Sequence, residues 1–235
     1  MPTPHRLTSP RLRSLMWRCA AALAVLLACE SASGSEARRH GPPAPAPTPA
    51  AHLSAEARTL ADWVVAAHDS RGRPFVIVDK RHATVSAFDA AGRPLASAPA
   101  LLGLARGDDS VPGIGERKIA DIQPHERTTP AGRFVAELGV NSGGEDILWV
   151  DYDAAVSMHR VRTVKASDRR LERLASATPD DNRISYGCIN VPAAFFDGFV
   201  KPLFSRRDGI VYVLPDTKAP AAVFGAAFAP RTAQR

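Results

Sequence analysis

The sequence predicts a mainly β domain with a few helices, preceded by one N-terminal helix. From residue 73 onward, short β-prone runs recur with turn signals between them, most clearly at 75–78 and 210–214. Upstream, apolar residues within 52–68 recur at helical spacing. Several short strands separated by turns favour a sandwich or a barrel over a fold of strand–helix–strand units.

The first 28 residues are typical of an export signal. An apolar run over 19–29 follows a basic start. A run of this length suits a signal core and is too short to span a bilayer. The positive charge before it comes from four arginines, Arg6, Arg11, Arg13 and Arg18. We therefore expect an exported protein of the bacterial cell envelope, located in the periplasm.

Cys29 lies in Leu26-Leu27-Ala28-Cys29, which resembles a lipoprotein processing site. Cleavage before Cys29 and lipidation of its thiol would anchor the protein to a membrane. Ordinary cleavage after Ser33 is the alternative, since Leu27 is not the small residue usually preferred, and the sequence leaves both open. Residues 29–51 form a Pro/Ala-rich linker that tends toward an extended polyproline II conformation.

The net charge gives little support for a nucleic-acid partner. The whole chain carries a formal charge of +6, and four of these charges are the arginines of the predicted signal. The exported part is therefore close to neutral for its length. A basic surface of the kind that binds phosphate backbones is not indicated.

The elements follow in order along the chain. The helix of the segment 52–72 has Ser54 as its N-cap and Glu56 in its first turn. Strands are expected over 75–78, 83–88, 94–102, 118–122, 132–138, 147–150, 154–159 and 210–214, and helices over 166–177 and 192–202. Residues 73–216 are expected to form one domain, and the Ala/Pro-rich residues 217–235 a flexible tail.

The residues around Cys188 carry the most chemistry. Cys188 is the only cysteine after residue 29, it follows Ser185-Tyr186-Gly187, and His159 lies upstream. A lone thiol with a neighbouring imidazole suits acyl transfer, because the thiolate is the nucleophile and the imidazole takes its proton. An inert buried thiol and a structural histidine are the alternatives. The spacing of Cys, His and acidic residues indicates no metal site, and we expect no cofactor.

This stretch resembles the L,D-transpeptidase (YkuD-type) catalytic domain family. The family carries a histidine, a gap and then Ser/Thr-x-Gly-Cys-apolar-Asn/Arg, which here are His159 and residues 185–190. The pattern over 78–92 and the Thr-Pro-Ala-Gly-Arg-Phe run at 129–134 resemble the family's opening hairpin and a later turn and strand. The resemblance covers about 140 residues, 75–214. It implies an L,D-transpeptidase-like β-sandwich.

The resemblance also implies residue roles. Cys188 would attack a peptide carbonyl to form a thioester, with His159 as general base and then general acid. Backbone N–H groups of Gly187 and Cys188 would stabilise the oxyanion. Ser185 would hydrogen-bond across the turn, and Asn190 would hold the loop or contact substrate amides.

Three further residues near the motif are candidates for substrate binding. The carbonyl of Arg160 is expected to orient His159, and its side chain is a candidate for the site. Arg183 could bind a substrate carboxylate, or be an ordinary surface arginine. Tyr186 could contact substrate or simply cover the site.

Three features depart from the family pattern. Arg160 stands where the family often has glycine, and Tyr186 where many members have a second histidine. The gap of 29 positions between His159 and Cys188 is longer than usual. The additional charged residues, 164–181, are expected to form a helix and a loop beside the site. These departures leave the nucleophile and the base in place, and the residues of the acceptor pocket undetermined.

The expected function is that of a cysteine L,D-transpeptidase in peptidoglycan remodelling. The resemblance implies a tetrapeptide-stem donor and an amine acceptor, giving a 3→3 cross-link or the attachment of another molecule. With water as acceptor, the same site would be an L,D-carboxypeptidase. A non-catalytic peptidoglycan-binding module and an unrelated cysteine peptidase are the remaining alternatives.

Overall fold

The computed structural model describes residues 46, 53–225 and 228 of the 235-residue chain. The predicted signal peptide, Cys29 and nearly all of the linker lie outside the described residues. Within those residues, no helix combines the length and the apolar character needed to cross a membrane.

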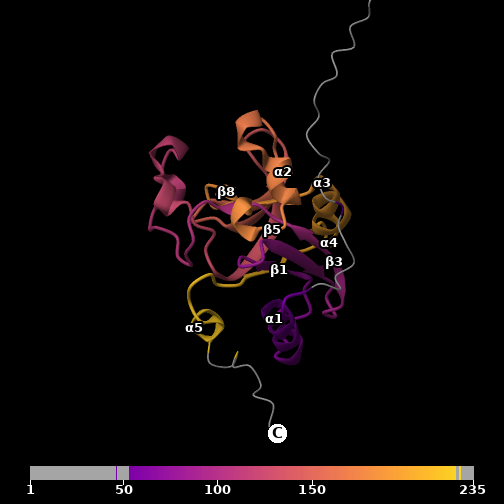
Figure 1. The fold of residues 1–235 in the computed structure, drawn as a ribbon. Helices are drawn as coiled ribbons and strands as arrows, with labels where there is room; N and C mark the ends of the chain where they lie inside the picture. Colours follow the sequence, from indigo (N-terminus) through magenta and orange to yellow (C-terminus); the bar gives the residue numbers. More distant parts are fainter. Residues whose placement is uncertain (1–45, 47–52, 226–227, 229–235) are drawn as a thin grey trace, which may run out of the picture. The chain divides into compact units, whose positions relative to one another are not determined.

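The fold is mainly β (Figure 1). The described strands are β1 (Phe75–Asp79), β2 (Thr84–Phe88), β3 (Pro94–Pro99), β4 (Leu102–Gly103), β5 (Gly132–Val140), β6 (Asp146–Asp151), β7 (Val156–Arg160), β8 (Arg183–Ser185), β9 (Ile189–Val191) and β10 (Gly209–Val213). Eight of them form one mixed sheet in the order β3-β2-β1-β10-β5-β6-β7-β9, and β4 pairs with β8 in a small second sheet.

Strands β1 and β10 are neighbours inside the large sheet, and both faces of each strand are apolar. They pair in parallel, with Phe75 opposite Ile210 and Val76 opposite Val211. Alternate residues enter different core clusters, Val76 and Val211 one and Phe75 and Ile210 the other. The continuous apolar runs in the sequence therefore reflect burial on both faces of the sheet.

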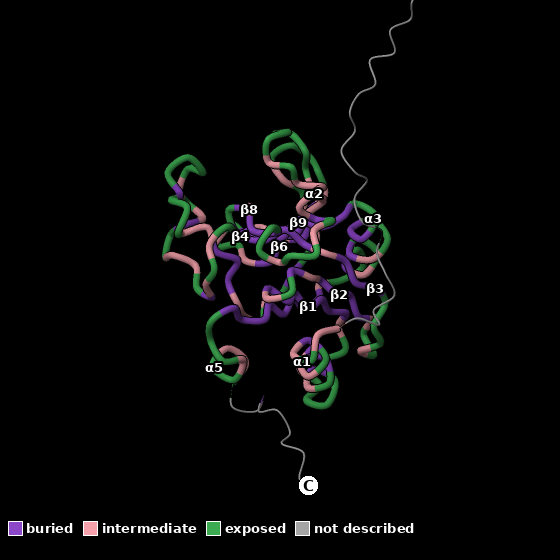
Figure 2. Tube along the Cα trace, in the orientation of Figure 1, coloured by how far each residue is buried: buried purple, intermediate pink, exposed green. Residues whose placement is uncertain are grey.

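Helices cover both faces of this sheet (Figure 2). On one face lies α1 (Ala55–Ala66), where Ser54 caps the helix by accepting a hydrogen bond from the Ala57 N–H. Leu60 and Val64 of α1 join the cluster around Phe75. The other face is covered by α3 (Ala193–Phe195), the π-helix η7 (Phe196–Val200) and α4 (Lys201–Phe204).

The expected class, mainly β with an N-terminal helix, is confirmed. The large sheet is continuous, yet one core cluster takes side chains from β1, β2 and β10 and also from β6, β7 and β9. The two halves of the sheet thus share a core, as the layers of a sandwich do. Most predicted strands are present within two residues of their expected bounds, whereas 94–102 is divided between β3 and β4.

The strand expected over 118–122 was wrong. Residues 114–126 instead contain three 3₁₀ turns, η2 (Ile114–Glu116), η3 (Ile119–Asp121) and η4 (Pro124–Glu126). Side chains take the carbonyls that a strand would need for pairing: Arg117 donates to Asp121 O at 2.6 Å and Arg127 to Ile122 O at 3.0 Å.

Two other expectations need correction. The helix expected over 166–177 is divided into η5 (Ala166–Asp168) and α2 (Arg170–Ala175), because Arg169 has a left-handed backbone with φ 50°. The tail expected to be flexible contains the short helix α5 (Pro220–Phe224), and Phe228 is buried in the α1 cluster. An Ala/Pro-rich composition does not reveal that Phe224 and Phe228 can pack on this face.

Candidate active site

Two neighbouring strands bring His159 and Cys188 together. Strand β7 pairs in parallel with β9, and His159 lies opposite Asn190 in this register. Cys188 immediately precedes β9, so its side chain is at the strand entrance beside β7. The two residues are 29 positions apart in the sequence, and sheet pairing makes them neighbours.

The thiol and the imidazole shift each other's pKa in opposite directions. Burial lowers the pKa of His159, but the hydrogen bond and the charge of Cys188 outweigh it, and the pKa lies above its ordinary value. Burial raises the pKa of Cys188, but the hydrogen bond and the charge of His159 bring it below the ordinary thiol value. Each group therefore favours the charged form of the other, a thiolate beside an imidazolium.

The main chain orients His159. Its Nδ1 lies 2.8 Å from the carbonyl oxygen of Arg160. Since a carbonyl only accepts, Nδ1 carries a proton and donates it, and Nε2 is left for the thiol. The Arg160 side chain is turned elsewhere: its Nε donates to Asp197 Oδ1 at 3.0 Å, and its guanidinium lies over the Phe196 ring. Arg160 thus contributes its carbonyl, and its expected contact with substrate is not supported.

Ser157 is a site residue that the sequence analysis missed. Its Oγ lies 3.6 Å from Cys188 Sγ. Hydrogen bonds from Ser157 also lower the pKa of the thiol. Ser157 and His159 are two positions apart on one strand, and side chains at this spacing share a face. The alternation of side chains along a strand was the sequence signal available for Ser157. It applies equally to every residue two positions from His159, so it did not single out Ser157.

The turn before Cys188 is closed by Ser185. Ser185 Oγ donates to the Cys188 carbonyl at 2.6 Å and accepts from the Gly187 N–H at 3.1 Å. The expected hydrogen bond of Ser185 across the turn is therefore present. The Gly187 N–H is already used and is not available to an oxyanion. Among the described residues, no backbone hydrogen bond takes the Cys188 N–H, which leaves it as the candidate donor.

Gly187 is required by backbone conformation and by space. Its φ is 131°, and a Cβ there would lie 2.9 Å from the Thr128 carbonyl oxygen. Thr129 holds the same turn through its hydroxyl group. Its Oγ1 donates to the Gly187 carbonyl at 2.8 Å and accepts from the Gly103 N–H at 2.9 Å. The Thr-Pro motif and the cysteine motif thus meet at Gly187.

Asn190 is buried and acts on the loop. Its Nδ2 donates to the Cys188 carbonyl at 3.2 Å, and its Oδ1 accepts from Arg170 at 2.8 Å. Only 1 % of the residue is exposed. Of its two expected roles, the geometry favours holding the loop over contact with substrate.

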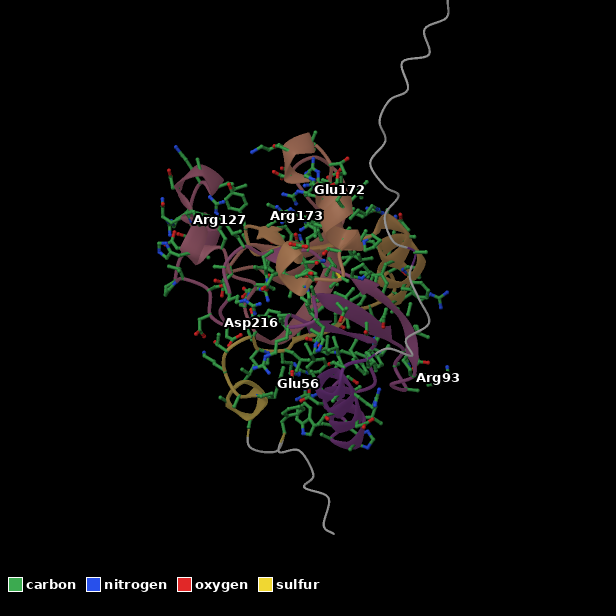
Figure 3. The ribbon with its side chains drawn as sticks, in the orientation of Figure 1. Glu56, Arg93, Arg127, Glu172, Arg173 and Asp216 are labelled. Atoms are coloured by element: carbon green, nitrogen blue, oxygen red, sulfur yellow. The ribbon has the colours of Figure 1, made fainter. Side chains whose placement is uncertain are left out.

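Tyr186 is exposed at the edge of the site. It is 38 % exposed, and the Arg127 guanidinium lies 4.0 Å from the centre of its ring. Arg127 comes from the magenta segment before β5 (Figure 3). Tyr186 and Arg127 together present a cation–π pair to solvent one residue from the Gly187 turn.

Arg183 is placed away from substrate. It is buried, and its Nη2 donates to Asp216 Oδ1 at 2.7 Å and to the Lys80 carbonyl at 2.8 Å. The expectation that it binds a substrate carboxylate is therefore corrected, since its guanidinium already holds one inside the fold. No sequence pattern indicates that Arg183 is buried, because its partner Asp216 lies 33 positions away.

Arg183 belongs to a buried charged cluster that reaches the turn. Lys80 Nζ donates to Asp108 Oδ1 at 2.9 Å, to Gly107 O at 2.6 Å and to Thr129 O at 2.8 Å, and Asp216 lies 3.7 Å away. Because Thr129 also binds the Gly187 carbonyl, the cluster supports the nucleophile turn from inside the fold.

Comparisons with known proteins give structural likenesses. No protein-family model and no curated protein matches the sequence. A mutant of the helical cell shape determining protein Pgp2 from Campylobacter jejuni matches at 12 % identity and a TM-score of 0.39, over 75 % of this chain and 62 % of that chain. The L,D-transpeptidase LdtMt1, in complex with imipenem, matches at 17 % identity and a TM-score of 0.34, over 60 % and 58 %. The catalytic domain of the E. faecium L,D-transpeptidase matches at 16 % identity and a TM-score of 0.31, over 61 % and 98 %.

The chain thus spans about three fifths of the length of the first two structures. Structures of L,D-transpeptidases and of Pgp2 are among those it is similar to. All these TM-scores are below 0.5, so the function argued below rests on the geometry of the site.

Proposed function

We propose that this protein is a cysteine acyltransferase of the L,D-transpeptidase type that acts on peptidoglycan stem peptides. The observation that carries the proposal is the pairing of Cys188 with His159. The imidazole is fixed through Nδ1 by the Arg160 carbonyl, which leaves its other nitrogen for the thiol. Their mutual pKa shifts favour the thiolate, which is the nucleophile of such chemistry.

The reaction would proceed in two acyl transfers. The Cys188 thiolate attacks the carbonyl of the bond between the diaminopimelate L-centre and the terminal D-Ala. The C–N bond breaks, His159 gives its proton to the leaving D-Ala amine, and a thioester remains on Cys188. An acceptor amine then attacks the thioester, His159 takes the proton of that amine, and the C–S bond breaks to release the thiolate.

The surrounding residues have separate parts in this scheme. The Cys188 N–H is the candidate oxyanion donor, and one such donor typically contributes about 3 kcal/mol to lowering the barrier. Ser157 stabilises the thiolate between turnovers. Tyr186 is the side chain at the rim that we propose contacts substrate. Water in place of the amine would give an L,D-carboxypeptidase, which shares the first half of the reaction.

We further propose that residues 1–28 export the protein to the periplasm and that 29–51 are a spacer before the catalytic part at 73–216. Attachment to a membrane through a lipid on Cys29 stays an alternative to a free periplasmic enzyme. Mass analysis of the protein recovered from an expressing bacterium separates these two cases, because a lipidated Cys29 adds acyl mass to the mature N-terminus.

The test is intact mass of the purified full chain after incubation with a carbapenem, whose β-lactam carbonyl is an acyl donor for an activated thiol. The wild type is expected to gain one carbapenem mass, and Cys188→Ala none. Synthetic tetrapeptide stem, offered with and without an amine acceptor, then separates transfer from hydrolysis by product mass. A folded wild type that forms no adduct and no product would leave the non-catalytic binding module as the better explanation.

A further inference from the structure

We infer that Arg170 is a positioning residue for the nucleophile loop, acting through Asn190 on the main chain of Cys188. Arg170 is outside the cysteine motif and belongs to the charged segment 164–181. The inference rests on the proposed function, because it concerns the reactivity of Cys188.

The guanidinium of Arg170 is held by two residues, Asn190 and Asp168. Arg170 Nη1 donates to Asn190 Oδ1 at 2.8 Å. Its Nε donates to Asp168 Oδ2 at 3.1 Å, and its Nη2 lies 3.0 Å from the same oxygen. The side chain is only 18 % exposed. Asp168 therefore fixes the guanidinium plane, and the remaining nitrogen is aimed at Asn190.

Arg170 determines which end of the Asn190 amide faces Cys188. An amide has one accepting end and one donating end. With Oδ1 held by the guanidinium, Nδ2 faces the Cys188 carbonyl and donates to it at 3.2 Å. The reversed amide would set two oxygens against each other at Cys188 and two donors at Arg170. The ion pair thus selects the one orientation that secures the loop.

The carbonyl that receives this bond belongs to the nucleophile itself. Cys188 O also accepts from Ser185 Oγ at 2.6 Å. Two donors from different residues therefore fix the Cys188 peptide, and with it the placement of the side chain that carries Sγ. Removing the Asn190 donor leaves the Cys188 carbonyl with Ser185 as its one side-chain donor among the described residues, and misplacement of a reacting atom lowers the rate.

Arg173 provides a matched control on the same helix. Its Nε donates to Asp168 O and its Nη1 to Asp181 O, both at 2.8 Å, within the segment 164–181. It is also labelled in Figure 3, on α2 beside Glu172. Arg173→Met removes the same charge and similar hydrogen bonds from the same segment, and it leaves the contact with Asn190 in place.

The experiment measures the rate constant for acylation of Cys188 by a carbapenem in the full chain. Arg170→Met, Arg173→Met, Asn190→Ala and the double variant Arg170→Met/Asn190→Ala are compared with wild type. We expect Arg170→Met to lower the rate about tenfold, as the loss of one charge-assisted hydrogen bond would. Arg173→Met stays within about twofold, and the double variant is no slower than Asn190→Ala alone.

Three results overturn the inference: Arg170→Met within twofold of wild type, Arg173→Met as slow as Arg170→Met, or a full further tenfold loss when Arg170→Met is added to Asn190→Ala. If Arg170→Met fails to fold, Asp168→Asn replaces it, with a smaller loss expected from a less constrained guanidinium. An unreactive wild type counts against the proposed function, whereas a reactive wild type with an unaffected Arg170→Met counts against this inference alone.

Discussion

Lys80→Met tests the buried charged cluster beneath the nucleophile turn. Lys80 is 0 % exposed, and its ammonium donates to one carboxylate and two main-chain carbonyls. Burial lowers the pKa of Lys80, and the hydrogen bond with Asp108 and the charge of Asp216 oppose that shift. Asp108 and Asp216 thus offset part of the cost of burying the ammonium. Methionine has a similar length, so the cavity left behind is small.

The magnitude follows from what the substitution leaves unpaired. The carbonyls of Gly107 and Thr129 each lose a donor, which typically costs about 1–3 kcal/mol for a buried group. Asp108 keeps donors from the main chain of residues 216–218, and Asp216 keeps Arg183. The loss is thus dominated by the carbonyls and by one uncompensated buried charge. We expect the free energy of unfolding to fall by about 3–5 kcal/mol.

The assay is urea unfolding, with the midpoint compared at constant slope. Lys201→Met is the control, since Lys201 pairs with Asp146 at the surface with its side chain 47 % exposed. Removing such a pair changes stability by about 1 kcal/mol or less. If Lys80→Met unfolds within 1 kcal/mol of wild type, the cluster is not the support for the turn that we describe.

Two further predictions concern the thiol. Thiolate appears as pH rises through the pKa of Cys188, which the contact with His159 holds below its ordinary value. In His159→Gln the thiol stays buried and loses that contact, so its alkylation by iodoacetamide should start at higher pH. Acyl transfer by this variant should fall by about 10²–10⁴. An unchanged alkylation profile would show that the imidazole does not act on the thiol. Ser157→Ala should also move the alkylation profile to higher pH, by less than His159→Gln does. It should slow alkylation at neutral pH about two- to fivefold, because one donor to the sulfur is lost. A profile identical to wild type would remove Ser157 from the site.

Local patterns were sufficient for most of the strands, for the start of α1 and for the candidate thiol–imidazole pair. The apolar runs of β1 and β10 predict strands because their side chains face two buried layers. Ser54 predicts the start of α1 because capping depends only on residues within one turn. Cys188 and His159 were identified by residue type and order, which folding does not alter.

The tertiary structure alone decided which polar groups are free. A buried Asp216 accepts a hydrogen bond from Arg183, and no periodic pattern encodes this pairing of residues 33 positions apart. Contacts such as Arg170 with Asn190 join segments that approach only because β9 lies beside β7 at the sheet edge. The sequence by itself thus determined the chemistry available to this protein. Sheet order determined which side chains carry it, because hydrogen-bond partners distant in sequence are set by the packing of whole strands.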